Sequence, residues 1–537
     1  MKKDNSKKIG KFQFLICVVL GIEVLVWFAG CKSVPKNQEN VSSKKIIQTD
    51  KPIDYSLTGN RATNKDFEYL KTYLTQCYVG YDEAKKNGFD VDQAIHKMKW
   101  HYTMSRLSHK RQKKEKREQY TFHNGVDNWA MSYAVGRVLH SEMGKAGIKD
   151  VHFAVRGDKN FRNVSPKLWP VFSNLYFEKQ GDEYFVSASP IEEIKAGMKF
   201  TDDEGNLYKY FLDGKEFYQF IPMSELYLKE SSINLNGKKY TVPVFYDDKF
   251  EYKKNYIGFE ETEDSIYISL SDCMLGVNES KEIYDQMMKR LDEVCELAKN
   301  SVNKKNIILD LRGNSGGYRM YPERVLKSVF YGNSEVKSMV YSNFTNHFDS
   351  GTLTLISKEI AWQVYQHDKA TPGFSEAEIQ NAKSAYEELA ANPKRVYDGL
   401  LDPVLQELPQ VRNSDFNGKF YILIDTNSAS AAELTVAFSY LEDKDKVVLI
   451  GTKSAGCIEY GGRYEYKLPY SEVEISLCRS NMSRIACLAQ NPHWHGDTYG
   501  FYPDYWCQNK DLLNTLIDLT GDKELKTTLA GIDFGLK

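Results

Sequence analysis

Two apolar runs that each lead into a turn of small residues constrain the fold most strongly. The first, residues 306–317, reads NIILDLRGNSGG, and the second, FYILID at 420–425, is followed by NSASAAE at 427–433. Short apolar runs that end in small residues are typical of buried strands. A helix expected at about 430–440 and another strand at 447–451 follow. This strand-helix-strand order predicts a parallel or mixed sheet covered on both faces.

The rest of the chain is long enough for several units. With 537 residues, two to four structural units are expected. We predict a multi-domain α+β protein with an α/β core: an export signal at 1–31, a flexible tether at 32–60, a helical domain at 61–155, a β-rich module at 165–250, and the core at 255–520 with an insertion at about 345–415. Helices are expected at 281–299, before the first motif, and at 375–392, within the insertion.

The N-terminus has the composition of an export signal. Five lysines precede an apolar stretch at 12–30, which ends in the sequence FAGC at 28–31. This end resembles the lipobox of bacterial lipoproteins, a resemblance that implies cleavage before Cys31 and acylation of that residue. An uncleaved anchor helix and plain secretion remain alternatives. All three place the folded part outside the cytoplasm, and the first predicts a lipid-anchored protein of a bacterial cell envelope.

Charge and metal-ligand spacing narrow the function further. The net charge of −2 argues against nucleic-acid binding, and the basic run at 106–117 is interpreted as a solvated surface. Cys457, Cys478, Cys487 and Cys507 could form one or two disulfides. The HWHGD sequence at 493–497 is the only metal-like cluster and is interpreted as a polar loop. No cofactor or metal is expected.

Ser430 lies where the second strand gives way to a helix. Its hydroxyl is expected near the positive end of that helix, with the Ala431 N–H beside it, as acyl-transfer chemistry needs. The alternative is a capping box, in which Ser430 satisfies free N–H groups and Glu433 reaches back to the serine. The local pattern leaves both readings open.

The glycine-rich turn after the first strand is the matching half of such a site. Three glycines, Gly313, Gly316 and Gly317, can turn backbone amides outward to bind an anion. A simple tight turn is the alternative. The chain has no GxxxxGK[ST] phosphate loop, and the GxSxG turn of the α/β-hydrolases is also missing.

Together the motifs resemble the serine peptidases of the C-terminal processing (tail-specific) and tricorn-core family. The similarity covers most of the chain after residue 60 and extends to DVH at 150–152 and GFYPD at 500–504. It implies a crotonase-like core, with Ser430 as nucleophile and an oxyanion site formed by the amides of Ala431 and of the Gly316–Gly317 pair. It also implies that the β-rich module stands in the place of a PDZ domain, although the carboxylate-binding loop of PDZ domains is not recognisable.

The chain departs from the tail-specific branch at the residue that serves there as the catalytic base. Cys457 occupies the position of that branch's catalytic lysine, and Lys453 lies four residues earlier. In the tricorn-like branch a histidine serves as base, and His152 matches it, although Val151 replaces the serine that precedes the histidine there. Glu472 and Glu474 are candidates for the supporting acid.

These observations predict an exported, membrane-tethered serine endopeptidase that cleaves extended polypeptides through an acyl-enzyme. Ser430 and His152 are the expected catalytic residues. The alternative is an inactive peptidase-fold lipoprotein that binds peptides, and a different acyl-chemistry enzyme on the same fold is a third possibility.

Overall fold

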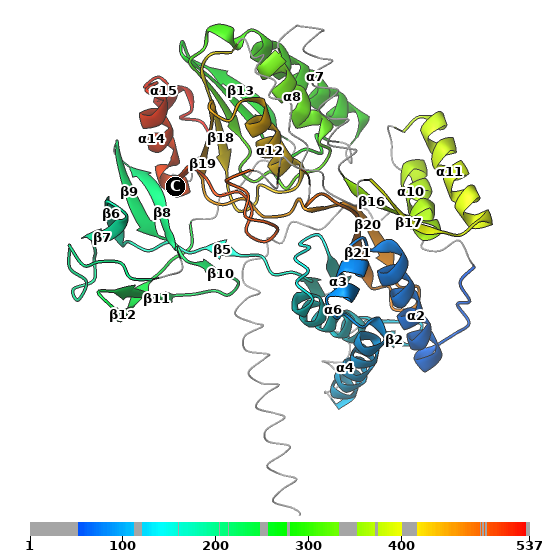
Figure 1. Ribbon diagram of the computed structural model, residues 1–537. Coiled ribbons are helices and arrows are strands. Elements are labelled where there is room, and N and C mark those ends of the chain that lie inside the picture. Colours follow the sequence, from blue (N-terminus) through cyan, green and yellow to red (C-terminus); the bar gives the residue numbers. More distant parts are fainter. Residues whose placement is uncertain are drawn as a thin grey trace, which may run out of the picture. The chain divides into compact units, whose positions relative to one another are not determined.

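The structure is a computed structural model of the whole chain. It describes residues 52–532, with gaps at 112–120, 159, 203–204, 213, 248–255, 277–279, 332–351, 371–373, 400–415, 484, 486–487 and 489–490. The described residues form two compact units, one at 169–206 and 219–246, and a larger one that comprises the rest. The mixed helices and sheets of these units (Figure 1) confirm the predicted multi-domain α+β fold.

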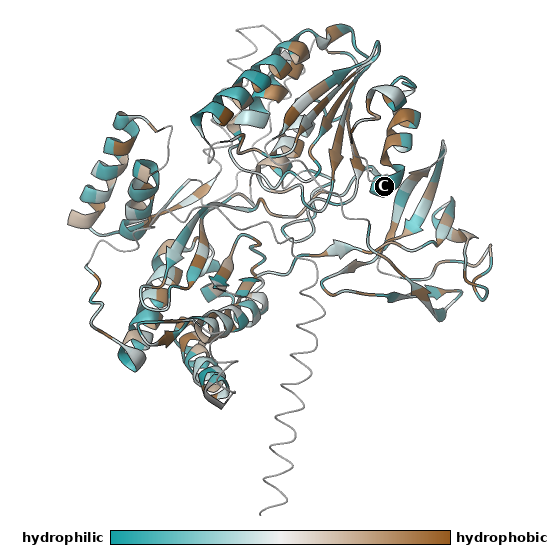
Figure 2. Ribbon diagram, turned by 180° about the vertical axis from the view of Figure 1, so that it is seen from behind, coloured by the Kyte–Doolittle hydropathy of each residue, from teal (hydrophilic) through white to brown (hydrophobic). Residues whose placement is uncertain are grey.

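The predicted strands form the central sheet of the larger unit. Its order is β13 (Ile257–Glu261), β14 (Ser265–Leu270), β15 (Asn306–Asp310), β18 (Lys419–Ile424), β19 (Val447–Gly451), β22 (Tyr505–Trp506) and β8 (Leu207–Leu212). Only β13 and β14 pair antiparallel in this series; the later neighbours are parallel. Parallel strands with both faces covered read as continuous apolar runs, and most of these strands are coloured as hydrophobic in Figure 2.

Helices cover both faces of this sheet. Side chains alternate along each strand, so successive apolar residues point to opposite faces and each face needs its own cover. Leu309 and Ile422 belong to the core cluster that includes residues of α7 (Lys281–Lys299), α8 (Met320–Tyr331) and α12 (Ala431–Asp443). On the other face, the Tyr421 hydroxyl donates to the Leu519 carbonyl at 3.0 Å. Leu519 belongs to α14 (Asn509–Thr520), which is followed by α15 (Leu525–Thr528).

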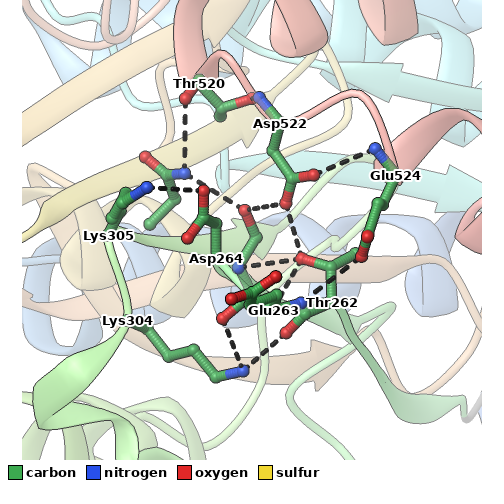
Figure 3. A network of polar contacts seen from close by, with 10 residues as sticks. Thr262, Glu263, Asp264, Lys304, Lys305, Thr520, Asp522 and Glu524 are labelled. Atoms are coloured by element: carbon green, nitrogen blue, oxygen red, sulfur yellow. Dashed lines mark hydrogen bonds and ion pairs between the residues drawn. The ribbon is translucent and has the colours of Figure 1, made fainter.

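A buried carboxylate ties the end of α14 to the edge of the sheet (Figure 3). The Asp522 Oδ2 atom accepts hydrogen bonds from the Thr262 and Ser265 hydroxyls at 2.5 and 2.6 Å. The Asn306 amide donates to the Ser265 hydroxyl at 3.1 Å. This network therefore links the β13–β14 turn, the start of β15 and the C-terminal helices.

A helical layer packs on a second sheet in the same unit. The helices are α2 (Gly59–Cys77), α3 (Tyr81–Lys86), α4 (Val91–Arg111) and α6 (Asn128–Lys145), with the β1–β2 hairpin (Phe122–His123, Val126–Asp127) between the last two. The sheet has the order β17 (Arg395–Asp398), β16 (Leu353–Ser357), β21 (Glu474–Asn481), β3 (Ala154–Gly157) and β4 (Asn160–Asn163), and β20 (Tyr460–Lys467) also pairs with β21. One apolar cluster joins α2, α4 and α6 to this sheet.

The smaller unit is β-rich. It contains the pairs β5 with β10 (Trp169–Pro170, Met223–Ser224), β6 with β7 (Tyr176–Gln180, Glu183–Ala188), and β11 with β12 (Glu230–Leu235, Lys238–Pro243). All three pairs are antiparallel.

The larger unit also contains α10 (Lys358–Ala370) and the short helix η2 (Ser301–Asn303), and β9 (Lys215–Phe220) follows β8.

Several local predictions can be compared with these elements. The helix expected at 281–299 is α7, and the helix expected at 375–392 is α11 (Glu376–Ala391), with a Ser375–Glu378 capping box. The export signal, Cys31 and most of the tether lie outside the described residues, as do Cys487 and part of the basic run. Cys457, Cys478 and Cys507 are free thiols, so the suggested disulfides do not form among these three.

None of the helices within the described residues has both the length and the apolar character needed to cross a bilayer.

Candidate active site

The two small-residue turns meet at one edge of the central sheet. Strands β15 and β18 pair in parallel with Asp310 opposite Leu423, so both turns leave the sheet at the same edge. The Ala429 N–H donates to the Asn314 carbonyl at 2.9 Å, and the Ser428 hydroxyl donates to the Leu311 carbonyl at 2.8 Å. These two bonds fix the serine turn against the glycine turn.

Ser430 has a backbone conformation that side chains rarely adopt. Its φ is +54° and its ψ is −116°, immediately before α12 begins at Ala431. A non-glycine residue with positive φ is strained, and such strain is concentrated at functional sites. The side chain is half-buried. The turn therefore places the hydroxyl at the N-terminal end of a helix, as the sequence predicted.

The predicted oxyanion amides lie around Ser430 but differ in their availability. Gly316 packs so closely that a Cβ on it would lie 2.6 Å from the Ser430 Cβ and 3.0 Å from the Ala431 nitrogen. Its own N–H is taken by the Asn314 side chain at 2.9 Å. Among the described residues no hydrogen bond is made by the N–H of Gly317 or of Ala431. These two amides are therefore the ones left to bind an anion.

Glu433 holds the serine turn to residues 454–457. Its Oε2 atom accepts hydrogen bonds from the backbone N–H of Ser430 at 3.0 Å and of Cys457 at 2.9 Å. Its Oε1 atom accepts from the Ser454 hydroxyl at 2.5 Å and the Gly456 N–H at 2.7 Å. Burial raises the pKa of this carboxyl, while these four donors act in the opposite direction. Glu433 does reach back to Ser430 as in a capping box, but it also organises residues 454–457.

Cys457 brings His152 to the same region. The Cys457 sulfur lies 3.3 Å from Nε2 and 3.4 Å from Nδ1 of His152, and is thus nearly equidistant from the two ring nitrogens. Val151, Ala455 and Cys457 form a small apolar cluster against Ala429, the residue before Ser430. Burial, with a contribution from the Arg463 charge, lowers the pKa of His152 to about 4, so the ring is neutral at physiological pH.

Asp150 supports the turn that carries His152. Its Oδ1 atom accepts hydrogen bonds from the N–H groups of His152 and Phe153 at 2.8 and 3.0 Å. The residue is fully buried, and burial raises its pKa to about 7. The carboxylate fixes the backbone of the histidine turn and makes no hydrogen bond with the imidazole among the contacts described.

Two lysines, the buried Lys453 and the half-buried Lys167, lie close to this cluster. The Lys453 ammonium donates to the Ser454 carbonyl at 2.6 Å, and burial, together with the charge of Lys167, lowers its pKa to about 7. Burial also lowers the pKa of Lys167, which the charges of Asp425, Cys457 and Glu433 oppose. Lys167 follows β4 and no motif marked it, so only the folded chain reveals that it approaches the site.

The other acidic and metal-like candidates have different roles. Glu472 pairs with Lys467 at 2.8 Å, and Glu474 lies 3.8 Å from Arg156. Asp497 accepts the backbone N–H groups of Ile458 and Glu459 through Oδ1. These partners of the three carboxylates are lysine, arginine and backbone N–H groups that hold the fold together. No contact among the described residues joins any of the three to the His152 ring.

In the GFYPD motif, Asp504 accepts the Leu449 N–H at 2.8 Å, which ties the motif to β19.

The comparison with protein-family models agrees with the motifs. Residues 267–471 match the model of peptidase family S41. No curated protein sequence matches the chain. Similar solved structures include mature CPAF with lactacystin (10% identity, 88% of this chain and 98% of that one, TM-score 0.35), the photosystem II D1 C-terminal processing protease (11%, 86% and 97%, 0.31) and the tricorn protease (14%, 87% and 36%, 0.29). At these TM-scores the structural similarities add nothing about the site residues.

Proposed function

We propose that the protein is an exported serine endopeptidase that cleaves extended polypeptides through an acyl-enzyme, starting from the match of residues 267–471 to the model of peptidase family S41. The observation that carries the proposal is the arrangement around Ser430. A strained serine precedes a helix, and the amides of Gly317 and Ala431, which make no hydrogen bond to any described residue, belong to the two turns that meet there. No cofactor or metal takes part in this reaction.

The proposed reaction begins with attack of the Ser430 oxygen on the scissile carbonyl. His152 accepts the hydroxyl proton, and its neutral ring has a lone pair available for this at physiological pH. The Gly317 and Ala431 amides stabilise the oxyanion. The proton then passes to the leaving amine as the C–N bond breaks, and water releases the acyl group by the same route.

Glu433 is the positioning residue in this scheme. One carboxylate oxygen accepts both the Ser430 and Cys457 N–H groups, and the Cys457 sulfur contacts His152. The nucleophile and the base come from segments far apart in the sequence, so their approach depends on this linkage. A small displacement of either group would cost much of the rate.

The cellular setting is part of the same proposal. The apolar stretch and the FAGC sequence support export, cleavage before Cys31 and attachment to a bacterial membrane through lipid on that cysteine. The domain boundaries given above also belong to the proposal, with the β-rich module as a degenerate PDZ-like unit.

One observation favours a second candidate, a peptidase-fold protein that binds peptides without turnover. The Cys457 sulfur contacts both ring nitrogens of His152, and burial keeps the pKa of that ring far below its ordinary value. Both features weaken a histidine as a proton acceptor.

The test is covalent labelling of the purified full chain by a fluorophosphonate. We expect labelling of the wild type and its loss in both Ser430→Ala and His152→Ala. Ser439→Ala is the matched control, because Ser439 is a buried serine of the same helix α12 whose hydroxyl donates to the Thr435 carbonyl within that helix. Labelling that survives His152→Ala but is lost in Lys453→Met would identify Lys453 as the base. An unlabelled wild type that cleaves no test protein would favour the peptide-binding alternative.

A further inference from the structure

The turn that carries His152 and strand β21 bring three metal-ligand side chains together. Strands β3 and β21 pair antiparallel, with Ala154 opposite Ser476 and Arg156 opposite Glu474. Continuing that register by two residues places Cys478 opposite His152. Asp150 and Cys478 are 328 positions apart in the sequence, so spacing in the chain could not have revealed this grouping.

The separations between these three side chains suit one small cation. One ligand atom from each of Asp150, His152 and Cys478 lies within 4.8 Å of the other two. The Cys478 sulfur is 3.9 Å from the Asp150 Oδ1 atom. Tetrahedral zinc, with bonds of about 2.0 to 2.3 Å, holds its ligand atoms roughly 3.5 Å apart. Closing the group around zinc therefore requires only small side-chain movements.

A second feature points to a missing partner at this place. Asp150 is fully buried, yet its Oδ2 atom makes no hydrogen bond in the part of the chain that the structure describes. The Tyr78 hydroxyl lies near enough to affect this carboxyl, but it makes no hydrogen bond of good geometry either. A buried carboxylate oxygen without a partner is costly; a small shift of the Tyr78 hydroxyl or a bound cation would satisfy it, and the cation alone also engages His152 and Cys478.

We propose that Asp150, His152 and Cys478 form a zinc site. Zinc binds thiolate, imidazole and carboxylate ligands, and this mixture suits zinc better than it suits magnesium or calcium. Binding replaces the Cys478 S–H bond by a Zn–S bond, and the thiol proton leaves to solvent. The carboxylate and thiolate charges together neutralise the dication, so the buried group carries no net charge. Water completes the tetrahedron.

Zinc at this site regulates the peptidase reaction, a consequence that rests on the proposed function, whereas metal binding itself does not. The metal takes the lone pair of a His152 nitrogen and fixes the ring. A ring held in this way cannot accept the Ser430 proton, so the zinc-loaded enzyme is inactive. Removing zinc restores the base, and the cluster thereby links peptidase activity to the availability of zinc outside the cytoplasm.

The test uses the reduced full chain, stripped of metal by a chelator and titrated with Co²⁺ as a spectroscopic probe. We expect one Co²⁺ per chain and a thiolate-to-cobalt charge-transfer band, both displaced by Zn²⁺. Cys478→Ser should abolish the band and weaken Zn²⁺ binding by at least about 100-fold in competition with a chromophoric chelator. Cys295→Ser, which removes a buried thiol of the other core cluster, should leave both unchanged.

Asp150→Asn provides a second ligand variant, and circular dichroism checks that each variant folds. Absence of the band from the wild type, or an unchanged band in folded Cys478→Ser, would overturn the zinc site. Fluorophosphonate labelling in the same samples separates the two proposals. A band without labelling in any metal state supports the zinc site while the peptidase function fails, and labelling without a band does the reverse.

Discussion

Glu433 and Asp66 are both fully buried carboxylates that hold a distant loop through its backbone N–H groups. Asp66, in α2, accepts the N–H groups of Tyr470 at 2.9 Å and Ser471 at 2.7 Å. Glu433, in α12, accepts three N–H groups and one hydroxyl. A buried carboxylate thus fastens the helical layer to one loop and the serine turn to another.

The difference between them lies in what each carboxylate holds. The loop at Asp66 leads from β20 to β21 and belongs to the packing of the helical layer on the second sheet. The loop at Glu433 contains Cys457, which contacts His152, and the other end of the clamp is Ser430 itself. A buried acid is therefore no sign of a functional site. Its partners decide whether it maintains a fold or positions a reaction.

The largest effect is expected from Glu433→Ala. Four donors lose their acceptor, and each unsatisfied buried group costs about 1 to 3 kcal/mol, so the free energy of unfolding should fall by roughly 4 kcal/mol or more. Fluorophosphonate labelling of the remaining folded protein should be lost, because Ser430 and Cys457 are no longer held together. Denaturant unfolding and labelling at low temperature measure the two effects. A folded Glu433→Ala protein that labels at the wild-type rate would contradict the positioning role.

A smaller change to stability but a similar loss of labelling is expected from Gly316→Ala. The new Cβ would lie 2.6 Å from the Ser430 Cβ and 2.7 Å from the Ala429 carbonyl oxygen, at a φ of +90°. Overpacking and backbone strain of this kind cost about 3 kcal/mol. Gly237→Ala is the matched control, since it has a φ of +72° and no atom within 4 Å of the new Cβ.

Gly237→Ala should lose only about 1 kcal/mol of unfolding free energy, from the positive φ alone, and none of its labelling. Equal labelling by the two glycine variants would mean that the close approach of the turns is unimportant for function.

The smallest effect on labelling is expected for Asp66, which instead governs the pH dependence of stability. Burial raises the pKa of Asp66 from 3.8 to about 6 in the folded protein. Between these values the folded state keeps a proton that the unfolded state has released, so stability falls as pH rises from about 4 to 6. The contribution is up to about 3 kcal/mol, and Asp66→Asn should remove it.

The free energy of unfolding of wild type and Asp66→Asn is measured in urea at pH 4, 5 and 6. The contribution of Asp66 is the change with pH in the difference between the two proteins. Parallel curves would show that Asp66 does not titrate in this window. Labelling per folded molecule should be the same for both proteins, in contrast to Glu433→Ala, because no group near Ser430 depends on Asp66.

The sequence by itself determined the strands of the central sheet, the two turns that follow them, and the position of Ser430 just before a helix. These depend on local rules: apolar runs form buried strands, small residues form tight turns, and a serine before a helix places its hydroxyl at the positive end. The helix at 281–299 followed from its apolar spacing, and the helix expected at 375–392 followed from the prolines that bound it. The capping box at Ser430 was also readable, including the reach of Glu433 back to the serine.

Only the tertiary structure decided what surrounds the serine. It showed that the Gly316 N–H donates to the Asn314 side chain. The amides of Gly317 and Ala431 are therefore the ones free to bind an oxyanion among the described residues. The tertiary structure also brought Cys457 against His152, Lys167 toward Glu433, and Cys478 beside Asp150. These groups come from segments hundreds of residues apart, and no local pattern records which strand pairs with which. Burial and electrostatic environment, which set the pKa of His152 and Lys453, arise only once those strands have paired.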